Sequence, residues 1–174
     1  MNKITHHSAV LAMLASIYRP KTYIELGLHD GETFNKVKNY CGRAIGVDIR
    51  KVHLDGEIHN CTTDEFFDQV IVNEKADMIF IDADHKYDSV IKDFENSLKV
   101  LNQGGCILLH DTDPESDHLF DPGYCGDSYR MVDYLESRGD INVVTIPCTE
   151  AGLSIVTRKD ETRTQRRLKG YING

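Results

Sequence analysis

Two short and almost continuously apolar runs, residues 77–82 (DMIFID) and 106–111 (CILLHD), constrain the fold more than any other feature of the sequence. A strand that is apolar on both sides is buried on both faces, as in a parallel sheet covered by helices. The segment between the two runs has the spacing of an amphipathic helix, which we expect to end at Gly104 and Gly105. The apolar positions of this helix are Val90, Ile91, Phe94, Leu98 and Leu101.

Strand and helix patterns alternate in the same way along the rest of the chain. A capping box, formed by Thr62 and Glu65, predicts the start of one helix. Further strands are expected at residues 22–26, 43–49 and about 58–61, and further helices at residues 6–18, 32–40 and 128–138.

Near the C-terminal end, the strand-like residues 142–147 and 152–158 are too close together for a crossover helix, so they are expected to form an antiparallel hairpin. The whole pattern predicts one α/β domain over residues 1–158, whose N-terminal helix lies within residues 1–20. Its sheet is expected to be Rossmann-like, doubly wound, seven-stranded and mostly parallel, with a C-terminal antiparallel hairpin strand. Residues 159–174 are expected to be a polar, basic tail. Its cations, Arg163, Arg166, Arg167 and Lys169, are interpreted as a solvated face, with a subunit contact as the alternative.

Composition limits the classes of partner. The chain has 174 residues and a formal net charge of −8, which argues against broad binding to nucleic acids or anionic membranes. Five scattered cysteines with no CxxC pair are typical of reduced thiols rather than of a disulfide or zinc framework. The sequence shows no membrane-spanning run and no signal-peptide pattern, so a cytoplasmic location is expected. Domains of this kind often dimerise, and a homodimer is an open expectation.

Polar residues follow each expected strand, and the carboxyl ends of such strands meet at one edge of the sheet. The first group, in the turn IELGLHDGETF, has the spacing ExGxxxG, with Glu25, Gly27 and Gly31. This spacing is not the GxGxxG of a dinucleotide site, and its acidic residues favour a ligand with positive charge. Asp48 ends the second strand, where a carboxylate can accept hydrogen bonds from both ribose hydroxyls. Thr62, Thr63 and Asp64 could present polar groups to an adenine edge, or serve only as a helix cap.

A second group of polar residues follows the two apolar runs: Asp82 and His85 after the first, His110 and Asp111 at the end of the second. Clustered carboxylates repel one another unless a cation, a metal ion or protons lie among them. Oxygen and imidazole ligands suit Mg²⁺ and related divalent cations. Asp84 is interpreted either as part of this cluster or as a helix cap.

The loop at residues 112–127 is long enough to be functional. Its Asp113, Asp117, His118 and Asp121 either extend a cation site or are solvated. His6, His7, His53 and His59 have no partners apparent in the sequence and are interpreted as ordinary surface or core residues.

Taken together, these motifs make the chain resemble the class I S-adenosylmethionine-dependent methyltransferases over about residues 23–158. In detail it looks like the small bacterial O-methyltransferases of the catechol and macrocin types. The resemblance is carried by IELGLHDGETF (24–34), IGVDI (45–49), the long segment 77–112 and AGLSIV (151–156). It implies that Glu25, Gly27 and Gly31 hold the methionine and ribose parts of the cofactor, that Asp48 binds the ribose, and that Thr62, Thr63 and Asp64 lie near the adenine.

The resemblance also implies a metal site and a reaction. In metal-dependent relatives the residues at Asp82 and Asp111 hold Mg²⁺, although Thr112 and His85 replace the usual asparagine and lysine. The expected reaction is methyl transfer from S-adenosylmethionine to a hydroxyl of a small molecule, which could be a sugar. His85 or His110 would be the base, and Asp82 would contact both cofactor and cation. Two alternatives stay open: a non-catalytic cofactor-binding or interaction module, and an NAD-dependent oxidoreductase on the same sheet.

Overall fold

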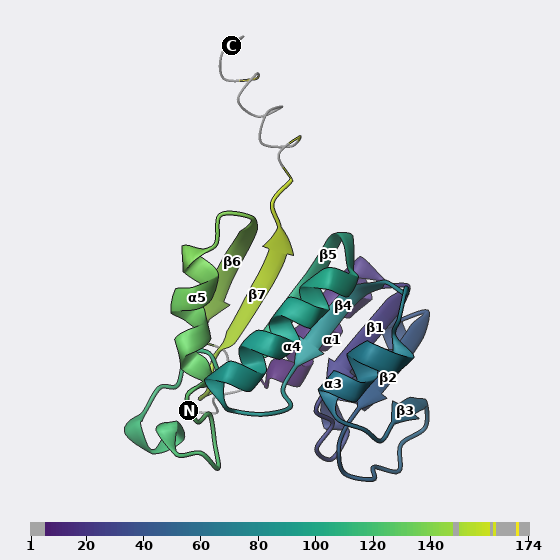
Figure 1. The fold of residues 1–174 in the computed structure, drawn as a ribbon, viewed down its shortest axis with the longest axis horizontal. Helices are drawn as coiled ribbons and strands as arrows, with labels where there is room; N and C mark the ends of the chain where they lie inside the picture. The colour runs from purple at the N-terminus through teal and green to yellow at the C-terminus, as the bar shows by residue number, and fades with distance from the viewer. Residues whose placement is uncertain (1–5, 148–149, 161, 163–169, 171–174) are drawn as a thin grey trace.

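A single seven-stranded sheet runs through the protein, with strand order β3-β2-β1-β4-β5-β7-β6, as Figure 1 shows. The computed structural model describes residues 6–147, 150–160, 162 and 170. Cys148 and the tail cations Arg163, Arg166, Arg167 and Lys169 lie outside the described residues. The strands are β1 (Thr22–Leu26), β2 (Arg43–Val47), β3 (Glu57–His59), β4 (Ala76–Ile81), β5 (Leu101–His110), β6 (Ile141–Ile146) and β7 (Leu153–Arg158).

Strands β3, β2, β1, β4 and β5 pair in parallel, and β7 pairs antiparallel with both β5 and β6. The predicted fold class, a mostly parallel doubly wound sheet closed by an antiparallel hairpin, is therefore confirmed. The helices are α1 (His7–Tyr18), α2 (Glu32–Val37), α3 (Thr63–Glu65), α4 (Tyr87–Val100) and α5 (Met131–Ser137), with short 3₁₀ or π turns η1 (Lys38–Tyr40), η2 (Phe66–Val70), η3 (Asp117–Phe120) and η4 (Ser128–Arg130).

Helices cover both faces of the sheet, which explains the continuous apolar runs. On one face, Ile79 and Ile107 pack with residues of α4 and α5, such as Phe94 and Leu135. On the other face, Met78 and Leu108 belong to a separate cluster with residues of α1 and α2. In Figure 1, α4 lies in front of the sheet and α1 behind it. Alternate residues of one strand therefore enter different cores, and both cores need apolar side chains.

The predicted boundary between the fourth helix and the fifth strand is wrong. The helix α4 ends at Val100, and Leu101 already pairs with Ala76 as the first residue of β5. The register then shifts to Met78 opposite Cys106, so the residues between them form a bulge. Gly104 takes a φ of 81° in this bulge. Its glycines therefore serve an irregular strand rather than the end of a helix.

Other boundaries differ by smaller amounts. β3 covers residues 57–59 rather than 58–61, and the helix after residue 62 is a single turn followed by a π turn. The predicted capping box is present: the Thr62 hydroxyl accepts from the Glu65 amide at 3.1 Å, and the Glu65 carboxylate accepts from the Thr62 amide at 2.9 Å. Among the described residues, no helix is both long and apolar enough to cross a bilayer.

A comparison of alanine substitutions at three glycines distinguishes two effects on stability, the strain of a positive φ and a steric clash. A Cβ on Gly139 would meet no atom within 4 Å, and the same holds for Gly104, although Gly104 has a positive φ. On Gly27, at φ 87°, a Cβ would lie 2.1 Å from the carbonyl oxygen of Asp82. We expect Gly139→Ala to leave stability nearly unchanged and Gly104→Ala to cost about 1–2 kcal/mol. Gly27→Ala is expected to cost roughly 2–5 kcal/mol, because it adds a clash to the same strain.

The measurement is urea unfolding of the three variants beside the parent protein. Equal costs at Gly104 and Gly27 would show that the close contact with Asp82 contributes nothing to stability.

Candidate cofactor and acceptor site

The turn after β1 lies directly against the end of β4. Gly27 and Gly31 both have positive φ angles, 87° and 79°. The Gly27 amide donates to the carbonyl of Val47 at 2.8 Å, and Gly31 is the left-handed residue that precedes α2. Because a side chain on Gly27 would collide with the Asp82 carbonyl, glycine is required where the two strand ends meet.

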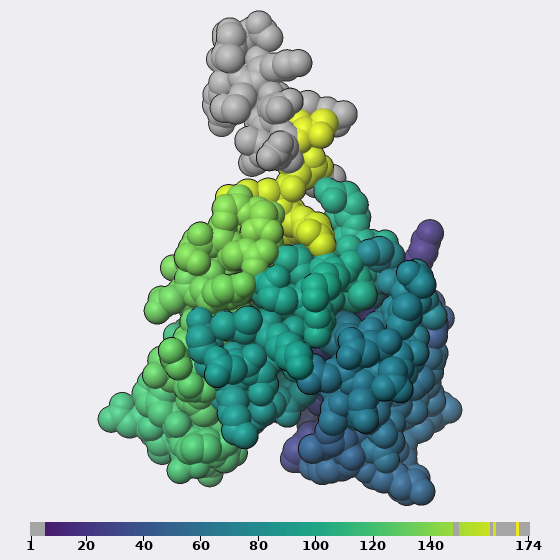
Figure 2. Space-filling model, viewed as in Figure 1, coloured from purple at the N-terminus to yellow at the C-terminus, as the bar shows by residue number. Residues whose placement is uncertain are grey.

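A cavity of about 610 Å³ opens at the carboxyl ends of β1, β2 and β4. Six of the residues predicted to bind cofactor line it: Gly27, Asp48, Thr62, Thr63, Asp64 and Asp82. The lining also includes Arg50, Ser89, Lys92 and Asp93, to which no sequence motif pointed. Figure 2 shows the molecule notched along its lower edge, between the green residues after β5 and the blue residues around β2 and β3.

The carboxylate of Asp48 is almost fully buried in this cavity wall. Its Oδ2 accepts from the amides of Leu28, at 3.0 Å, and His29, at 3.2 Å. Its Oδ1 accepts from the amide of Arg50 at 2.7 Å. Burial would raise the pKa of Asp48, but hydrogen bonds from the Arg50 side chain and from these amides hold it below its ordinary value. The group is therefore a fixed anion at neutral pH.

Glu25 and Gly31 do not line either of the two cavities described here. Glu25 is buried in the core, where its Oε2 accepts from the Tyr23 hydroxyl at 2.5 Å. Burial raises the pKa of Glu25 to about 8, against the opposing effect of the Tyr23 hydrogen bond. The carboxyl is therefore mostly protonated at neutral pH, and the geometry favours a role in holding the turn. A direct contact with cofactor stays a prediction.

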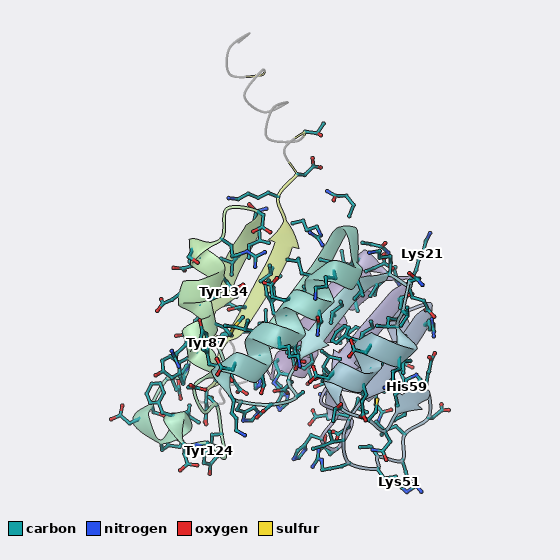
Figure 3. The ribbon with its side chains drawn as sticks, viewed as in Figure 1. Lys21, Lys51, His59, Tyr87, Tyr124 and Tyr134 are labelled. Carbon is teal, nitrogen blue, oxygen red and sulfur yellow. The ribbon has the colours of Figure 1, made fainter. Side chains whose placement is uncertain are left out.

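A second cavity, of about 890 Å³, adjoins the first and shares His29, Asp82 and His85 with it. His110 and Asp111 lie in its wall beside this shared boundary. Residues 115–125 of the loop after β5 close another side of the cavity with Leu119, Tyr124 and Cys125. Figure 3 shows Tyr124 at the lower left of the molecule, away from Lys51, which follows β2. The two cavities therefore meet at the end of β4, with different segments forming their outer walls.

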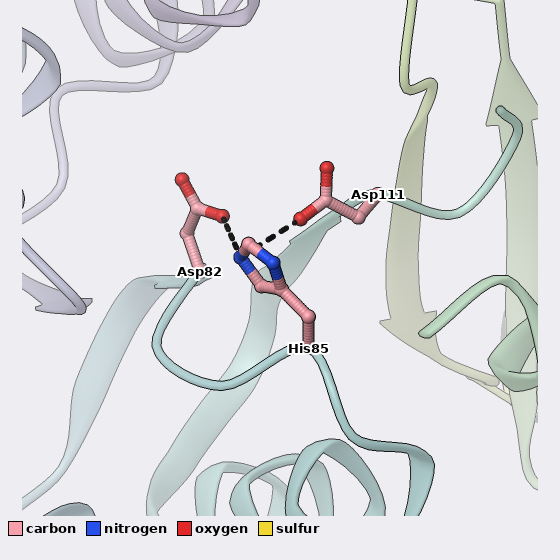
Figure 4. Close-up of side chains that lie close together, drawn as sticks. All are labelled: Asp82, His85 and Asp111. Atoms are coloured by element: carbon pink, nitrogen blue, oxygen red, sulfur yellow. Dashed lines mark ion pairs between the residues drawn. The ribbon is translucent and has the colours of Figure 1, made fainter. Parts of the chain in front are cut away.

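Acidic and imidazole groups converge at this boundary. The His85 Nε2 lies 3.2 Å from the Asp111 Oδ2 and 4.0 Å from the Asp82 Oδ1, as Figure 4 shows. The His110 Nδ1 lies 3.0 Å from Asp111 and 3.3 Å from Asp82. One ligand atom from each of Asp82, His85 and Asp111 lies within 4.8 Å of the others, so this set could hold a metal ion.

The positive charge that two neighbouring carboxylates require is available from His110. Burial alone would lower the pKa of His110, but the charges of Asp82 and Asp111 and its hydrogen bonds to them raise it to about 10. Burial would likewise raise the pKa of Asp111, but its hydrogen bond with His110 and the nearby imidazoles lower it. An imidazolium between two carboxylates satisfies the electrostatics of the cluster.

The interpretation of His6 and His7 as residues without convergent partners is wrong. Both line the second cavity, and the rings of His7 and His110 lie 4.1 Å apart. The His7 Nε2 also lies 3.1 Å from the Thr33 hydroxyl of α2. Burial, and then the charge of His110, lower the pKa of His7 to about 3, so this ring is neutral. His7 was missed because its partner His110 is distant in sequence and only the packing of α1 brings them together.

The loop after β5 supports the cluster through its last residues. The Cys125 thiol lies 3.4 Å from the Asp111 Oδ1. The Asp127 amide donates to the His85 carbonyl at 3.1 Å, and the Asp127 carboxylate accepts from the Tyr87 amide at 2.7 Å. Asp127 thus caps α4, whereas Asp84 accepts from the Ser89 hydroxyl at 2.8 Å and lines the first cavity. Asp113, Asp117, His118 and Asp121, interpreted either as an extension of a cation site or as solvated residues, line neither cavity.

The buried carboxyl of Glu25 makes stability depend on pH. Between the pKa of an unfolded glutamate, about 4.3, and the folded pKa of about 8, the folded protein keeps a proton that the unfolded chain has released. The free energy of unfolding should therefore fall as pH rises through this window, by an amount on the order of a few kcal/mol. Glu25→Gln should remove this part of the pH dependence, because an amide cannot titrate.

Urea unfolding at pH 5, 6, 7 and 8 would measure the difference between the parent protein and Glu25→Gln. Glu136→Gln, at an exposed position on α5, is the matched control. A constant difference between parent and Glu25→Gln across this range would show that Glu25 is ionised in the folded protein.

Comparison with known proteins agrees with this geometry. Residues 24–112 match the model of a methyltransferase-domain family, and they contain the last three residues of β1, the whole of β4 and β5, and the residues Asp82, His85, His110 and Asp111. A curated relative, an uncharacterized protein of Acanthamoeba polyphaga mimivirus, is 28% identical over 133 residues, which are 60% of this chain and 58% of that protein. The chain thus spans less than two thirds of that relative's length.

Solved structures show the same fold. An O-methyltransferase from Bacillus cereus in complex with S-adenosylhomocysteine aligns with a TM-score of 0.72 at 17% identity, covering 91% of this chain and 84% of the other. The O-methyltransferase TomG from Streptomyces achromogenes, in complex with S-adenosylmethionine, aligns with a TM-score of 0.67 at 15% identity, covering 88% and 80%. Since the family model matches just over half of the chain, the protein belongs to this methyltransferase-domain family.

Proposed function

We propose that this protein is an S-adenosylmethionine-dependent O-methyltransferase that acts on the hydroxyl of a small molecule. The observation that carries this proposal is the shared boundary of the two cavities, formed by His29, Asp82 and His85. Methyl transfer requires the donor and the acceptor to meet in line, and such positioning can lower a barrier by about 7–11 kcal/mol. Two adjoining cavities with a common wall provide that arrangement.

The charge of the first cavity fits a sulfonium cofactor. Among the described residues that line it, five are aspartates, and two, Arg50 and Lys92, are cations. The Lys92 Nζ lies 2.6 Å from the Asp64 Oδ2, so part of its positive charge is balanced within the protein. The turn places Leu28, His29 and Asp30 where a dinucleotide fold would present bare amides to a diphosphate. An acidic wall favours a cationic ligand and disfavours NAD, whose diphosphate is negative.

The residues expected to hold the cofactor follow from this cavity. Asp48 would accept from the ribose, Thr62, Thr63 and Asp64 would lie toward the adenine, and Gly27 would allow close approach of the main chain. When bound, S-adenosylmethionine supplies an electrophilic methyl group. The protein's own contribution is to orient the acceptor hydroxyl and to take its proton.

His85 is the residue best placed to accept that proton. It lines both cavities, and its side chain is 32% exposed, whereas that of His110 is 14% exposed and lines only the second cavity. His110 and Asp111 would then hold the imidazole and balance its charge through the contacts described above. In the predicted catalytic set, His85 would thus be the base, His110 a positioning residue, and Asp82, 3.3 Å from the His110 Nδ1, a counter-charge for that imidazole.

A divalent cation such as Mg²⁺ is a further part of the proposal. Asp82 and Asp111 would supply carboxylate oxygens to it at the boundary where the acceptor hydroxyl would lie, while His85 would serve as the base. A cation there would lower the pKa of that hydroxyl. The volume of the second cavity fits an acceptor of drug-like size, and its carboxylates and imidazoles could hydrogen-bond to the hydroxyls of an acceptor such as a sugar. A cytoplasmic location and a homodimer stay predictions.

Ligand-induced stabilisation tests the cofactor. At 100 times its dissociation constant, S-adenosylhomocysteine should stabilise the protein by about 2.7 kcal/mol. For a chain of this size the melting temperature should rise by roughly 5–11 °C. NAD, measured in parallel, should give no shift. A shift with NAD alone would favour the oxidoreductase alternative, and binding without turnover across a broad acceptor panel would favour a non-catalytic module.

Mn²⁺ binding, followed by the loss of the free-ion signal in electron paramagnetic resonance, tests the cation site. We expect Asp111→Asn to weaken binding by at least about tenfold, because it removes a ligand oxygen. Asp113→Asn is the control, since Asp113 lines neither cavity. No Mn²⁺ binding by the parent protein at millimolar concentration would contradict the proposed cation site.

A further inference from the structure

The carboxylate of Asp48 has more hydrogen-bond donors than it has acceptor positions. Besides the amides of Leu28, His29 and Arg50, it accepts two bonds from the Arg50 side chain. The Arg50 Nε lies 3.2 Å from Oδ1, and one terminal nitrogen lies 3.2 Å from Oδ2. A carboxylate offers about four lone-pair positions, and five donors already surround this one.

Two ribose hydroxyls therefore cannot bind Asp48 while all five donors stay in place. The three amides belong to the main chain of the turn after β1 and of the residues after β2, and the turn is fixed by the contact of Gly27 with Asp82. The guanidinium is different. The Arg50 side chain is 57% exposed, whereas that of Asp48 is 6% exposed, so only the arginine can turn out into solvent. Both side chains line the first cavity.

We propose that the Arg50 side chain competes with the cofactor ribose for Asp48 and thereby weakens cofactor binding. This inference rests on the proposed function, since it takes S-adenosylmethionine as the ligand of the first cavity. Binding would exchange the two guanidinium bonds for two hydroxyl bonds while the three amide bonds remain. The Asp48 carboxylate thus accepts hydrogen bonds from five donors both before and after binding. This matters because a buried carboxylate without partners is costly.

The competition determines whether a mutation of Arg50 strengthens or weakens cofactor binding. Removing a cation that contacts a ligand normally weakens binding, but removing a competitor strengthens it. Arg50→Ala should therefore bind S-adenosylhomocysteine more tightly than the parent protein, by about two- to fivefold for a half-exposed ion pair. The homocysteine compound is the better probe because it lacks the sulfonium charge, so a change in overall charge affects it least.

Isothermal titration with S-adenosylhomocysteine tests this proposal on variants of Arg50, Lys51 and Asp48. Lys51→Ala is the matched control, because Lys51 is the neighbouring exposed cation, lines neither cavity and is labelled in Figure 3. Its dissociation constant should equal that of the parent protein. Arg50→Lys keeps the charge without the paired donors of the guanidinium and should lie between the parent and Arg50→Ala. Arg50→Ala in an Asp48→Asn background should give no gain, because the competed carboxylate is absent.

An unchanged or larger dissociation constant for Arg50→Ala would overturn the proposal while leaving the proposed function intact. An equal gain for Lys51→Ala would also overturn it, since the effect would then be one of net charge. If the parent protein and all variants fail to bind S-adenosylhomocysteine, the proposed function falls, and this inference falls with it. The melting temperatures of the ligand-free variants, measured in parallel, show whether each one is folded.

Discussion

The close approach of Gly27 to the carbonyl of Asp82 is the contact on which the rest of the site depends. It joins the turn after β1 to the end of β4, and β1 and β4 are neighbouring parallel strands. Because Gly27 lines the first cavity and Asp82 lines both, the contact sets the distance between the wall of the first cavity at Asp48 and the cluster of Asp82, His85, His110 and Asp111. A side chain at residue 27 would force these two walls apart. The glycine thus matters for alignment as much as for the shape of the turn.

Electrostatics divides the site into two regions that are balanced in different ways. In the wall of the first cavity, the Asp48 carboxylate is held as an anion by main-chain amides and by the exposed cation Arg50. At the boundary, Asp82 and Asp111 are balanced by a buried imidazole, His110. An exposed cation can be replaced by a ligand at little cost, whereas a buried one cannot. The first arrangement suits a cofactor that must enter and leave, and the second suits a fixed catalytic group.

Much of this arrangement could be predicted from the sequence, because it depends on local patterns. Continuous apolar runs identified the buried strands, and the rule that ligands bind at strand carboxyl ends brought Asp48, Asp82 and Asp111 to one edge. Patterns failed where a local signal had two meanings. Gly104 and Gly105 could end a helix or form a bulge, and only the pairing of Leu101 with Ala76 decides between them. Glu25 has an acid's expected place in the motif, but its burial beside Tyr23 keeps it away from both cavities.

Apart from Arg50, Ser89, Lys92 and Asp93 of the first cavity, the residues that no pattern revealed line the second cavity, for a physical reason. Its outer walls come from α1 and from the loop after β5, which contribute His7 and Cys125. Neither segment has a hydrophobic period that identifies its inward-facing side chains. His7 contacts His110, which is distant in sequence, and Cys125 contacts Asp111 from the other end of a loop. The sheet edge fixes the first cavity and the cluster, while the segments packed on it shape the second cavity, the proposed space for the acceptor. A change of acceptor could therefore arise in α1 or this loop without disturbing the contact of Gly27 with Asp82.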